Sequence, residues 1–254
     1  MMIKNLFRKK VRPKKLFNKI NFFFNYIYII YKMNIEEHLK CVRKNVPFPQ
    51  DHINYLYKLK NSGFEPKIIY DIGCCVLHWT DIVKKLWPNA KIILFDAFTA
   101  SEFLYKDYDY FVGVLSNKDN MIIPFFQNDI YPGGNSYYKE IGHPESKNLY
   151  NDSTCFLRET YTLDTIVKNK NFPLPDLVKI DVQGCEKDII EGGIKTISNT
   201  AHLIVELQHE EYNLNAPLAK ETVPYIEKIG FKCVAPLFCN NGPDGDYAFE
   251  NIYR

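Results

Sequence analysis

The segment Pro175-Asp-Leu-Val-Lys-Ile-Asp-Val-Gln-Gly-Cys-Glu-Lys-Asp188 joins a short apolar run to a polar one. Its apolar part, Leu177–Val182, is rich in β-branched residues, a pattern typical of a strand buried on both faces of a parallel sheet. Asp181 and Glu186 fall where such a strand would give way to a helix. In open α/β sheets, ligands bind at the carboxyl ends of the strands. The segment therefore predicts an α/β fold with two carboxylates at a ligand-binding edge.

The same residues also allow a purely structural interpretation. Gly184 would make a tight turn, and Glu186 would favour the first turn of a helix through the helix dipole. Turns from a strand into a helix often contain such residues, so the sequence leaves both interpretations open.

A second group of predicted elements precedes this segment. Ile68–Ile72 is a candidate strand, Gly73 follows it, and a helical pattern leads to a further strand, Ile92–Phe95, that ends at Asp96. This order is typical of the nucleotide-binding half of a Rossmann-like fold, in which an acid after the second strand binds the ribose hydroxyls. The 23 positions from Gly73 to Asp96 are close to the spacing of roughly 20 expected for that acid.

Two motifs resemble those of the FkbM family of S-adenosylmethionine-dependent methyltransferases. Lys179–Glu186 is similar to the family's Lys-Ile-Asp-Val-Glu-Gly-x-Glu signature, with Gln183 in place of the second acid. Asp71–Thr80 is similar to Asp-Ile-Gly-Ala-Asn-x-Gly-x-x-Thr, with Cys75 replacing Asn and Leu77 replacing the second Gly. The resemblance extends from about residue 67 to about residue 253. It implies a Rossmann-like class I methyltransferase fold, a doubly wound, mostly parallel seven-stranded sheet with an antiparallel edge strand.

The remaining segments fit that architecture. The third strand is expected at Asp109–Leu115, with Met121–Gln127 as its hairpin partner, and Asp164 is expected to cap the helix that begins beside it. Later elements are a strand at Leu203–Leu207, a helix at Ala219–Ile229, a strand at Phe231–Pro236 and an edge strand at Tyr247–Tyr253.

The resemblance implies S-adenosylmethionine as the cofactor. A dinucleotide needs several glycines so that the backbone can approach its pyrophosphate, whereas a sulfonium cofactor has no phosphate, so the glycine-poor loop favours methyl transfer over nicotinamide chemistry. Leu77 is expected to fill space that a glycine would leave beside the ligand. The alternatives are that Asp71 caps a helix or turn and that Ser116 caps a turn. The candidate cofactor-binding residues are Asp71, Gly73, Cys75, Asp96, Ser116 and Asp181.

Methyl transfer from a sulfonium requires alignment of the acceptor and removal of its proton. The candidate catalytic residues are Asp181, Glu186, Glu206 and His209. His209 suits a base because its ordinary pKa lies near neutrality. The alternative is that His209 only caps a helix or pairs with Glu210, and no metal site is predicted. The loop Tyr131–Tyr138 is a candidate lid or substrate loop.

Composition divides the 254-residue chain into an extension, 1–32, N-terminal helices, 33–66, and the Rossmann-like domain, 67–254. The extension contains nine Lys or Arg and no acid, and the remainder has 23 basic and 30 acidic residues. The domain therefore offers no basic groove for nucleic acid. The extension is too short in apolar length to span a bilayer, and weak contact with a membrane surface, packing on the domain or a weakly ordered leader remain open.

Seven cysteines without a Cys-x-x-Cys pair indicate reduced thiols and a cytoplasmic protein. The resemblance to the FkbM family implies O-methylation of a hydroxyl on a sugar, a glycan or another small metabolite. The alternatives are a catalytically silent binding module and an NAD-dependent oxidoreductase. Oligomeric state is left open.

Overall fold

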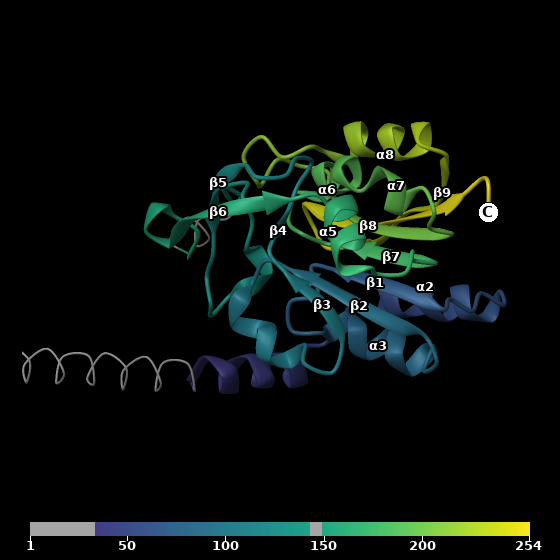
Figure 1. The fold of residues 1–254 in the computed structure, drawn as a ribbon, viewed down its shortest axis with the longest axis horizontal. Helices are drawn as coiled ribbons and strands as arrows, with labels where there is room; N and C mark the ends of the chain where they lie inside the picture. Colours follow the sequence, from purple (N-terminus) through teal and green to yellow (C-terminus); the bar gives the residue numbers. More distant parts are fainter. Residues whose placement is uncertain (1–33, 143–148) are drawn as a thin grey trace, which may run out of the picture.

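The computed structural model describes residues 34–142 and 149–254 (Figure 1). Its centre is a seven-stranded sheet in the order β3-β2-β1-β7-β8-β10-β9. The strands are β1 Ile68–Ile72, β2 Lys91–Asp96, β3 Asp109–Val112, β7 Leu177–Ile180, β8 His202–Gln208, β9 Phe231–Asn240 and β10 Asp244–Asn251.

Most neighbouring strands are parallel, and β10 runs antiparallel to both β8 and β9. The predicted Rossmann-like fold with a mostly parallel seven-stranded sheet is thus confirmed. The segment expected as the edge strand lies in β10, second from the edge, because β9 pairs along its outer side. The strand order reverses between β1 and β7, which are hydrogen-bonded neighbours. A crevice for a ligand opens at such a reversal.

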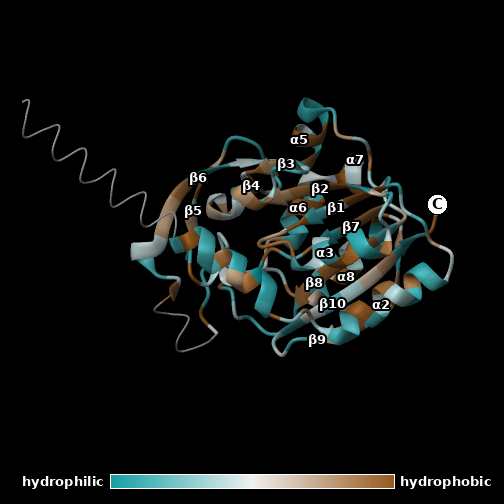
Figure 2. Ribbon diagram, turned by 90° about the horizontal axis from the view of Figure 1, so that it is seen from below, coloured by the Kyte–Doolittle hydropathy of each residue, from teal (hydrophilic) through white to brown (hydrophobic). Residues whose placement is uncertain are grey.

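Helices cover both faces of this sheet. Successive strand residues alternate between the two layers: Ile69 and Leu94 pack under α2 and α3, whereas Tyr70 and Phe95 pack under α5 to α8. Figure 1 shows the two helix layers on opposite sides of the sheet, and Figure 2 shows hydrophobic residues concentrated along the strands. The helices are α2 Gln50–Asn61, α3 His78–Leu86, α5 Leu163–Lys170, α6 Glu186–Gly192, α7 Ile194–Ile197 and α8 Ala219–Lys228.

A further helical segment, residues 34–45, lies against the loop after β1. Ile35 and Leu39 pack with Val76 and Phe98, and Arg43 forms two hydrogen bonds with the Asp81 carboxylate at 2.8 and 2.6 Å. The first described helix therefore supports the loop that precedes α3. The extension 1–32, with its predicted membrane-surface contact, lies outside the described residues.

A second, three-stranded sheet has the order β4-β6-β5, with β4 Val114–Leu115, β5 Ile122–Phe126 and β6 Cys155–Tyr161. The strand predicted over Asp109–Leu115 is divided at Gly113, whose N–H donates to the Asp96 carbonyl at 2.8 Å. The prediction that Met121–Gln127 forms a hairpin with that strand was wrong. This segment instead pairs antiparallel with β6. Most positions of β6 are exposed or half-buried, so its sequence lacks the apolar pattern that predicts a strand.

The predicted cap of α5 was also wrong. Thr162 is the N-cap residue, and its hydroxyl accepts from the Thr165 N–H. Asp164 instead accepts from the N–H groups of Lys195 and Thr196 at 3.1 and 2.9 Å, at the start of α7. These contacts between α5 and α7 span 31 and 32 positions of sequence, which a local pattern could not indicate.

All seven cysteines lie within the described residues and are free thiols. Of the helices in the described ranges, none has the length and apolar content needed to traverse a bilayer.

Candidate active site

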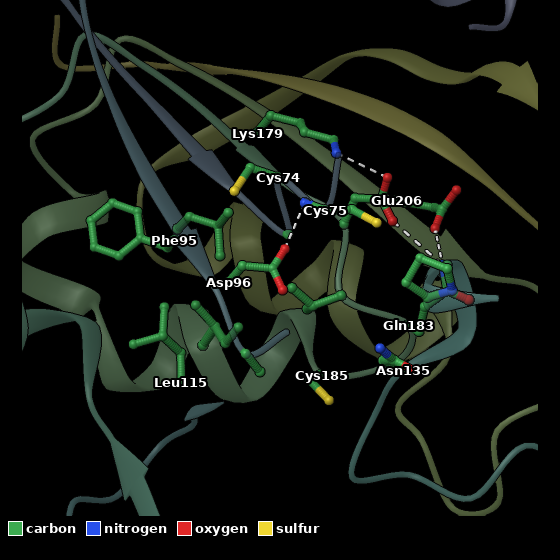
Figure 3. A pocket seen from close by; sticks show the side chains of 18 of the residues that line it. Cys74, Cys75, Phe95, Asp96, Leu115, Asn135, Lys179, Gln183, Cys185 and Glu206 are labelled. Carbon is green, nitrogen blue, oxygen red and sulfur yellow. Dashed lines mark hydrogen bonds and ion pairs between the residues drawn. The ribbon is translucent and has the colours of Figure 1, made fainter. Parts of the chain in front are cut away.

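A cavity of about 300 Å³ lies at the carboxyl ends of β1, β2 and β7 (Figure 3). This volume is at the lower end of the range for small-molecule sites. Its wall includes the loops after these strands and the segment 132–137. Among its lining residues are Gly73, Cys75, Trp79, Asp96, Asn135, Tyr137, Lys179, Asp181, Gln183, Cys185 and Glu206.

Gly73 shapes the cavity through its backbone. It has φ +81°, and a Cβ at this position would lie 1.8 Å from the carbonyl oxygen of Asp181. Its N–H donates to the Phe95 carbonyl at 2.9 Å. The loop after β1 can cross the end of β7 at this distance only because residue 73 has no side chain.

Leu77 does not narrow the cavity. It has φ +71° and its side chain is fully buried with Leu56 and Trp79 in the core under α3, and Leu77 itself is not among the lining residues. The expectation that Leu77 fills space beside the ligand was therefore wrong. A left-handed conformation costs a non-glycine residue about 1–2 kcal/mol. Full burial of a leucine contributes about 1.5–3 kcal/mol, which offsets that cost.

Asp96 lies at the end of β2 and holds the loop after β1. Its Oδ2 accepts from the Cys75 N–H at 2.6 Å (Figure 3). Its Oδ1 accepts from the Phe98 N–H at 2.7 Å. Burial raises the pKa of Asp96 to about 6. Each carboxylate oxygen keeps a second lone pair, so the group can still accept a hydrogen bond from a ligand hydroxyl in the cavity.

Lys179 is the buried cation at this end of the sheet. Its Nζ lies 2.9 Å from Asp181 Oδ2 and 3.9 Å from Asp71 Oδ1. Burial acts against its charge, but these two carboxylates raise the pKa of Lys179 above its ordinary value. Asp71 is itself fully buried, accepts a hydrogen bond from Thr80 and does not line the cavity. Asp71 therefore lies in the layer of residues behind the cavity lining, where its charge stabilises the Lys179 ammonium group.

Asp181 and Glu206 are joined by Gln183. The Gln183 Nε2 donates to Glu206 Oε2 at 2.9 Å and to Asp181 Oδ1 at 3.4 Å (Figure 3). Burial disfavours the ionised form of Asp181, but Lys179 and a hydrogen bond from Glu206 hold its pKa below the ordinary value. Burial and the neighbouring Asp181 raise the pKa of Glu206. Because the two carboxyl groups interact, they titrate as a pair, and burial and their mutual repulsion favour one proton on the pair.

Three other candidate residues lie outside the lining. Glu186 is buried, and its Oε1 accepts from the Val182 and Gly184 N–H groups at 3.0 and 3.1 Å, so it supports the left-handed turn before α6. Ser116 is buried, with its hydroxyl 3.5 Å from that of Tyr137. His209 Nδ1 lies 3.2 Å from the Tyr247 hydroxyl. The structure therefore gathers Gly73, Cys75, Asp96, Asp181 and Glu206 at the cavity and leaves these three, with Asp71, behind or beside it.

A family model described as the methyltransferase FkbM domain matches residues 72–233. The chain belongs to the FkbM methyltransferase family. S-adenosylmethionine is the cofactor of this family, as the motifs implied, and the nicotinamide alternative has no support in this match.

Solved structures are similar at low identity. An FkbM methyltransferase from Methylobacillus flagellatus KT has a TM-score of 0.45 and 11% identity, with 72% of this chain and 43% of that chain covered. The N-methyltransferase NodS from Bradyrhizobium japonicum has a TM-score of 0.41 and 11% identity, with 86% of this chain and 97% of that chain covered. A putative O-methyltransferase from Klebsiella pneumoniae has a TM-score of 0.43 and 12% identity, with 87% of this chain and 89% of that chain covered. This chain thus spans less than half of the Methylobacillus protein. A comparison with curated proteins gives no match.

The cavity of this member of the FkbM family fits the cofactor of the family. The carboxylates of Asp181 and Glu206 would complement a sulfonium cation, and Asp96 would accept from ribose hydroxyls. Gly73 adds no side chain to the part of the wall where the loop after β1 crosses β7. Within the described ranges, no group of three His, Cys, Asp or Glu side chains is arranged to hold a metal ion.

Sequence reasoning missed three residues of the site as candidates: Lys179, Gln183 and Asn135. Gln183 lines the cavity but was noted only as a departure from the family signature. Lys179 was part of the signature but was treated only as a strand residue. Asn135 lines the cavity, its Oδ1 accepts from the Asn128 N–H at 2.7 Å, and its buried Nδ2 has no hydrogen-bond partner among the described residues. The glycine- and asparagine-rich composition of Tyr131–Tyr138 was the available signal, and Pro132, Gly133, Asn135 and Tyr137 of that loop do line the cavity.

Proposed function

We propose that the protein transfers the methyl group of S-adenosylmethionine to a hydroxyl of a sugar, a glycan or another small metabolite. The observation that supports this most directly is the Asp181–Gln183–Glu206 cluster on the cavity wall. An alcohol must lose its proton as its oxygen is methylated, and a coupled carboxylate pair that keeps one group ionised can receive that proton. A neutral amine is a stronger nucleophile than a neutral alcohol and can be methylated before it loses a proton, so it has less need of such a group.

The residues divide into three roles in this proposal. Asp96 orients the ribose of the bound cofactor, and the Gly73 loop supplies the close backbone surface. Lys179 keeps Asp181 ionised and fixed in place through the 2.9 Å ion pair. Asp181 and Glu206 face the reacting centre and receive the acceptor proton. The bound cofactor supplies the methyl group as a sulfonium, whose leaving group is a neutral thioether.

The loop Tyr131–Tyr138 is proposed to contact the acceptor. Asn135 presents an unpartnered amide donor, and Tyr137 is held by its hydroxyl 2.8 Å from Asp188 Oδ2. An acceptor oxygen would satisfy the Asn135 amide. The open cavity beside Gly73 gives no reason to prefer the alternative of a catalytically silent binding module.

The test is a transfer assay with S-adenosylmethionine carrying a labelled methyl group. The purified chain would be incubated with panels of neutral monosaccharides, methyl glycosides, oligosaccharides and polyols, and methyl ethers would be identified by mass spectrometry. Formation of an O-methyl product that depends on Asp181 is expected. Failure of the chain to bind S-adenosylmethionine in a calorimetric titration would contradict the proposal without any knowledge of the acceptor.

A further inference from the structure

The carboxylate pair has an unusual charge environment for a site that binds a cation. Lys179 contacts both Asp71 and Asp181, so its single positive charge is shared between two acids. With Glu206 included, these four groups have a net charge of −2 when all are ionised. Two carboxylates in one partly buried place cannot both ionise at low energy, and one of them retains a proton.

Gln183 fixes the geometry of this pair. The Tyr212 hydroxyl lies 2.8 Å from Gln183 Oε1, which orients the amide so that its Nε2 faces the two carboxyl groups. Tyr212 is itself 2.6 Å from Asp244 Oδ2. The amide therefore gives Asp181 and Glu206 a common donor without adding a charge. A glutamate at this position, as in the family signature, would place a third carboxylate against Glu206.

The other charged groups around the pair come from neighbouring elements. From β10, Asp244 and Asp246 add negative potential at Glu206. Asp246 is paired with His52 of α2 at 2.8 Å, and Asn241 donates to Glu206 Oε1 at 3.2 Å. Among the described residues, Lys179 is the cation in contact with the pair. The pair therefore lies in a negative field that a bound cation would relieve.

We propose that Gln183 holds Asp181 and Glu206 as a pair that shares one proton, and that the pair releases this proton to solvent when S-adenosylmethionine binds. The inference rests on the proposed function, because it takes S-adenosylmethionine as the ligand of the cavity. A sulfonium charge beside the pair stabilises its second ionisation, whereas the neutral sulfur of S-adenosylhomocysteine does not.

This proton release has a consequence for the reaction. With the cofactor bound, both carboxylates are ionised and one can accept the proton of the acceptor hydroxyl. As the oxygen–carbon bond forms and the carbon–sulfur bond breaks, the bond pair stays on sulfur, and the acceptor proton returns to the pair. In the product state, a singly protonated pair lies beside a neutral thioether. The site therefore binds S-adenosylhomocysteine less tightly than S-adenosylmethionine. Gln183 is a positioning residue in this scheme, since it acts through the two acids.

Isothermal titration calorimetry at pH 7 in phosphate and in Tris measures the proton release, because these buffers differ in ionisation enthalpy. The full chain would be titrated with S-adenosylmethionine and with S-adenosylhomocysteine. We expect proton release with the first ligand and clearly less with the second. In Glu206→Gln the release should disappear, and the preference for the cationic ligand should fall by about 10-fold, the equivalent of one pKa unit.

Glu210→Gln is the matched control, since Glu210 is exposed just beyond the end of β8 and does not line the cavity. Its titrations should equal those of the unaltered chain. Gln183→Leu removes the bridging amide while keeping both acids. It is the second variant should Glu206→Gln fail to fold. The number of protons released on S-adenosylmethionine binding should differ from that of the unaltered chain. Circular dichroism would establish that each variant is folded.

The outcomes separate the two proposals. Equal proton release for both ligands, or release that persists unchanged in Glu206→Gln, overturns the shared-proton inference and leaves the proposed function standing. Absence of binding by either ligand overturns the proposed function and this inference together.

Discussion

The carbonyl oxygen of Asp181 lies 1.8 Å from the point where a Cβ on Gly73 would stand. The loop after β1 and the end of β7 thus meet backbone to backbone, at the place where the strand order of the sheet reverses. This contact joins the two halves of the FkbM signature, Asp71–Thr80 and Lys179–Glu186, into one wall of the cavity.

Gly73→Ala should abolish cofactor binding and lower stability. The added methyl group meets backbone, which cannot move aside as a flexible side chain would, and φ +81° is strained for alanine. We expect a loss of stability above 2 kcal/mol in urea unfolding, from the sum of steric overlap and strain. Gly63→Ala is the control for the steric part, since Gly63 has a similar φ of +91°, does not line the cavity, and a Cβ there meets nothing within 4 Å. Wild-type stability in Gly73→Ala would show that the loop does not pass this close to β7.

Leu77→Gly, which restores the residue of the family motif, should destabilise the protein without improving the cavity. The change relieves a left-handed conformation worth about 1–2 kcal/mol but removes a fully buried leucine, a loss of about 2–5 kcal/mol. Net destabilisation of about 1–3 kcal/mol is therefore expected in urea unfolding. The affinity for S-adenosylmethionine, measured by calorimetry, should stay within twofold. Tighter binding in the variant would mean that Leu77 does obstruct the ligand.

This position shows where sequence reasoning succeeded and where it failed. Strand–glycine–helix–strand order and the motif Lys179–Glu186 were sufficient to predict the fold and the edge of the sheet at which the cavity lies. They were insufficient to predict side-chain direction, because a motif gives the spacing of Leu77 and Glu186 but not whether they face the ligand or the core. Leu77 faces the core and Glu186 faces its own turn.

The same limit applies to contacts between distant segments. Asp164 contacts the start of α7, and β5 pairs with β6, across long stretches of intervening chain, so no local sequence pattern indicates either contact. The loop at Asn135 lacks regular periodicity, so its place on the cavity wall depends on tertiary structure.

Glu186→Gln should preserve the turn and alter the pH dependence of stability. The amide oxygen can still accept from the Val182 and Gly184 N–H groups. Burial raises the pKa of Glu186 to about 8, above its unfolded value near 4.5. A raised pKa in the folded state means that the group contributes stability below pH 4.5 that is lost as the pH rises through about 8. The variant should therefore lose less stability than the unaltered chain between pH 5 and about 8, measured by urea unfolding.

Glu186→Ala is the contrasting variant. It leaves two buried N–H groups without their acceptor, at a cost of about 1–3 kcal/mol for each unsatisfied group. If Glu186→Gln and Glu186→Ala were equally unstable, the carboxylate would have a role other than bracing the turn.

Asp181→Asn and His209→Asn form a pair that decides which polar side chains act in transfer. Asp181 lines the cavity, forms an ion pair with Lys179 at 2.9 Å and shares the Gln183 amide with Glu206. His209 contacts Tyr247 and does not line the cavity. Replacement of the carboxylate by an amide removes a proton acceptor, so the transfer rate of Asp181→Asn should fall by about 10²–10⁴-fold, the usual range for a general base. His209→Asn should stay within about twofold of the unaltered rate, because its ring meets no reacting group. Thermal unfolding would check that both variants are folded, and the rates would be compared on the acceptor identified by the transfer assay. Full activity in Asp181→Asn would show that the carboxylate pair takes no part in the mechanism. A comparable loss of rate in His209→Asn would support the predicted role of His209 as the base.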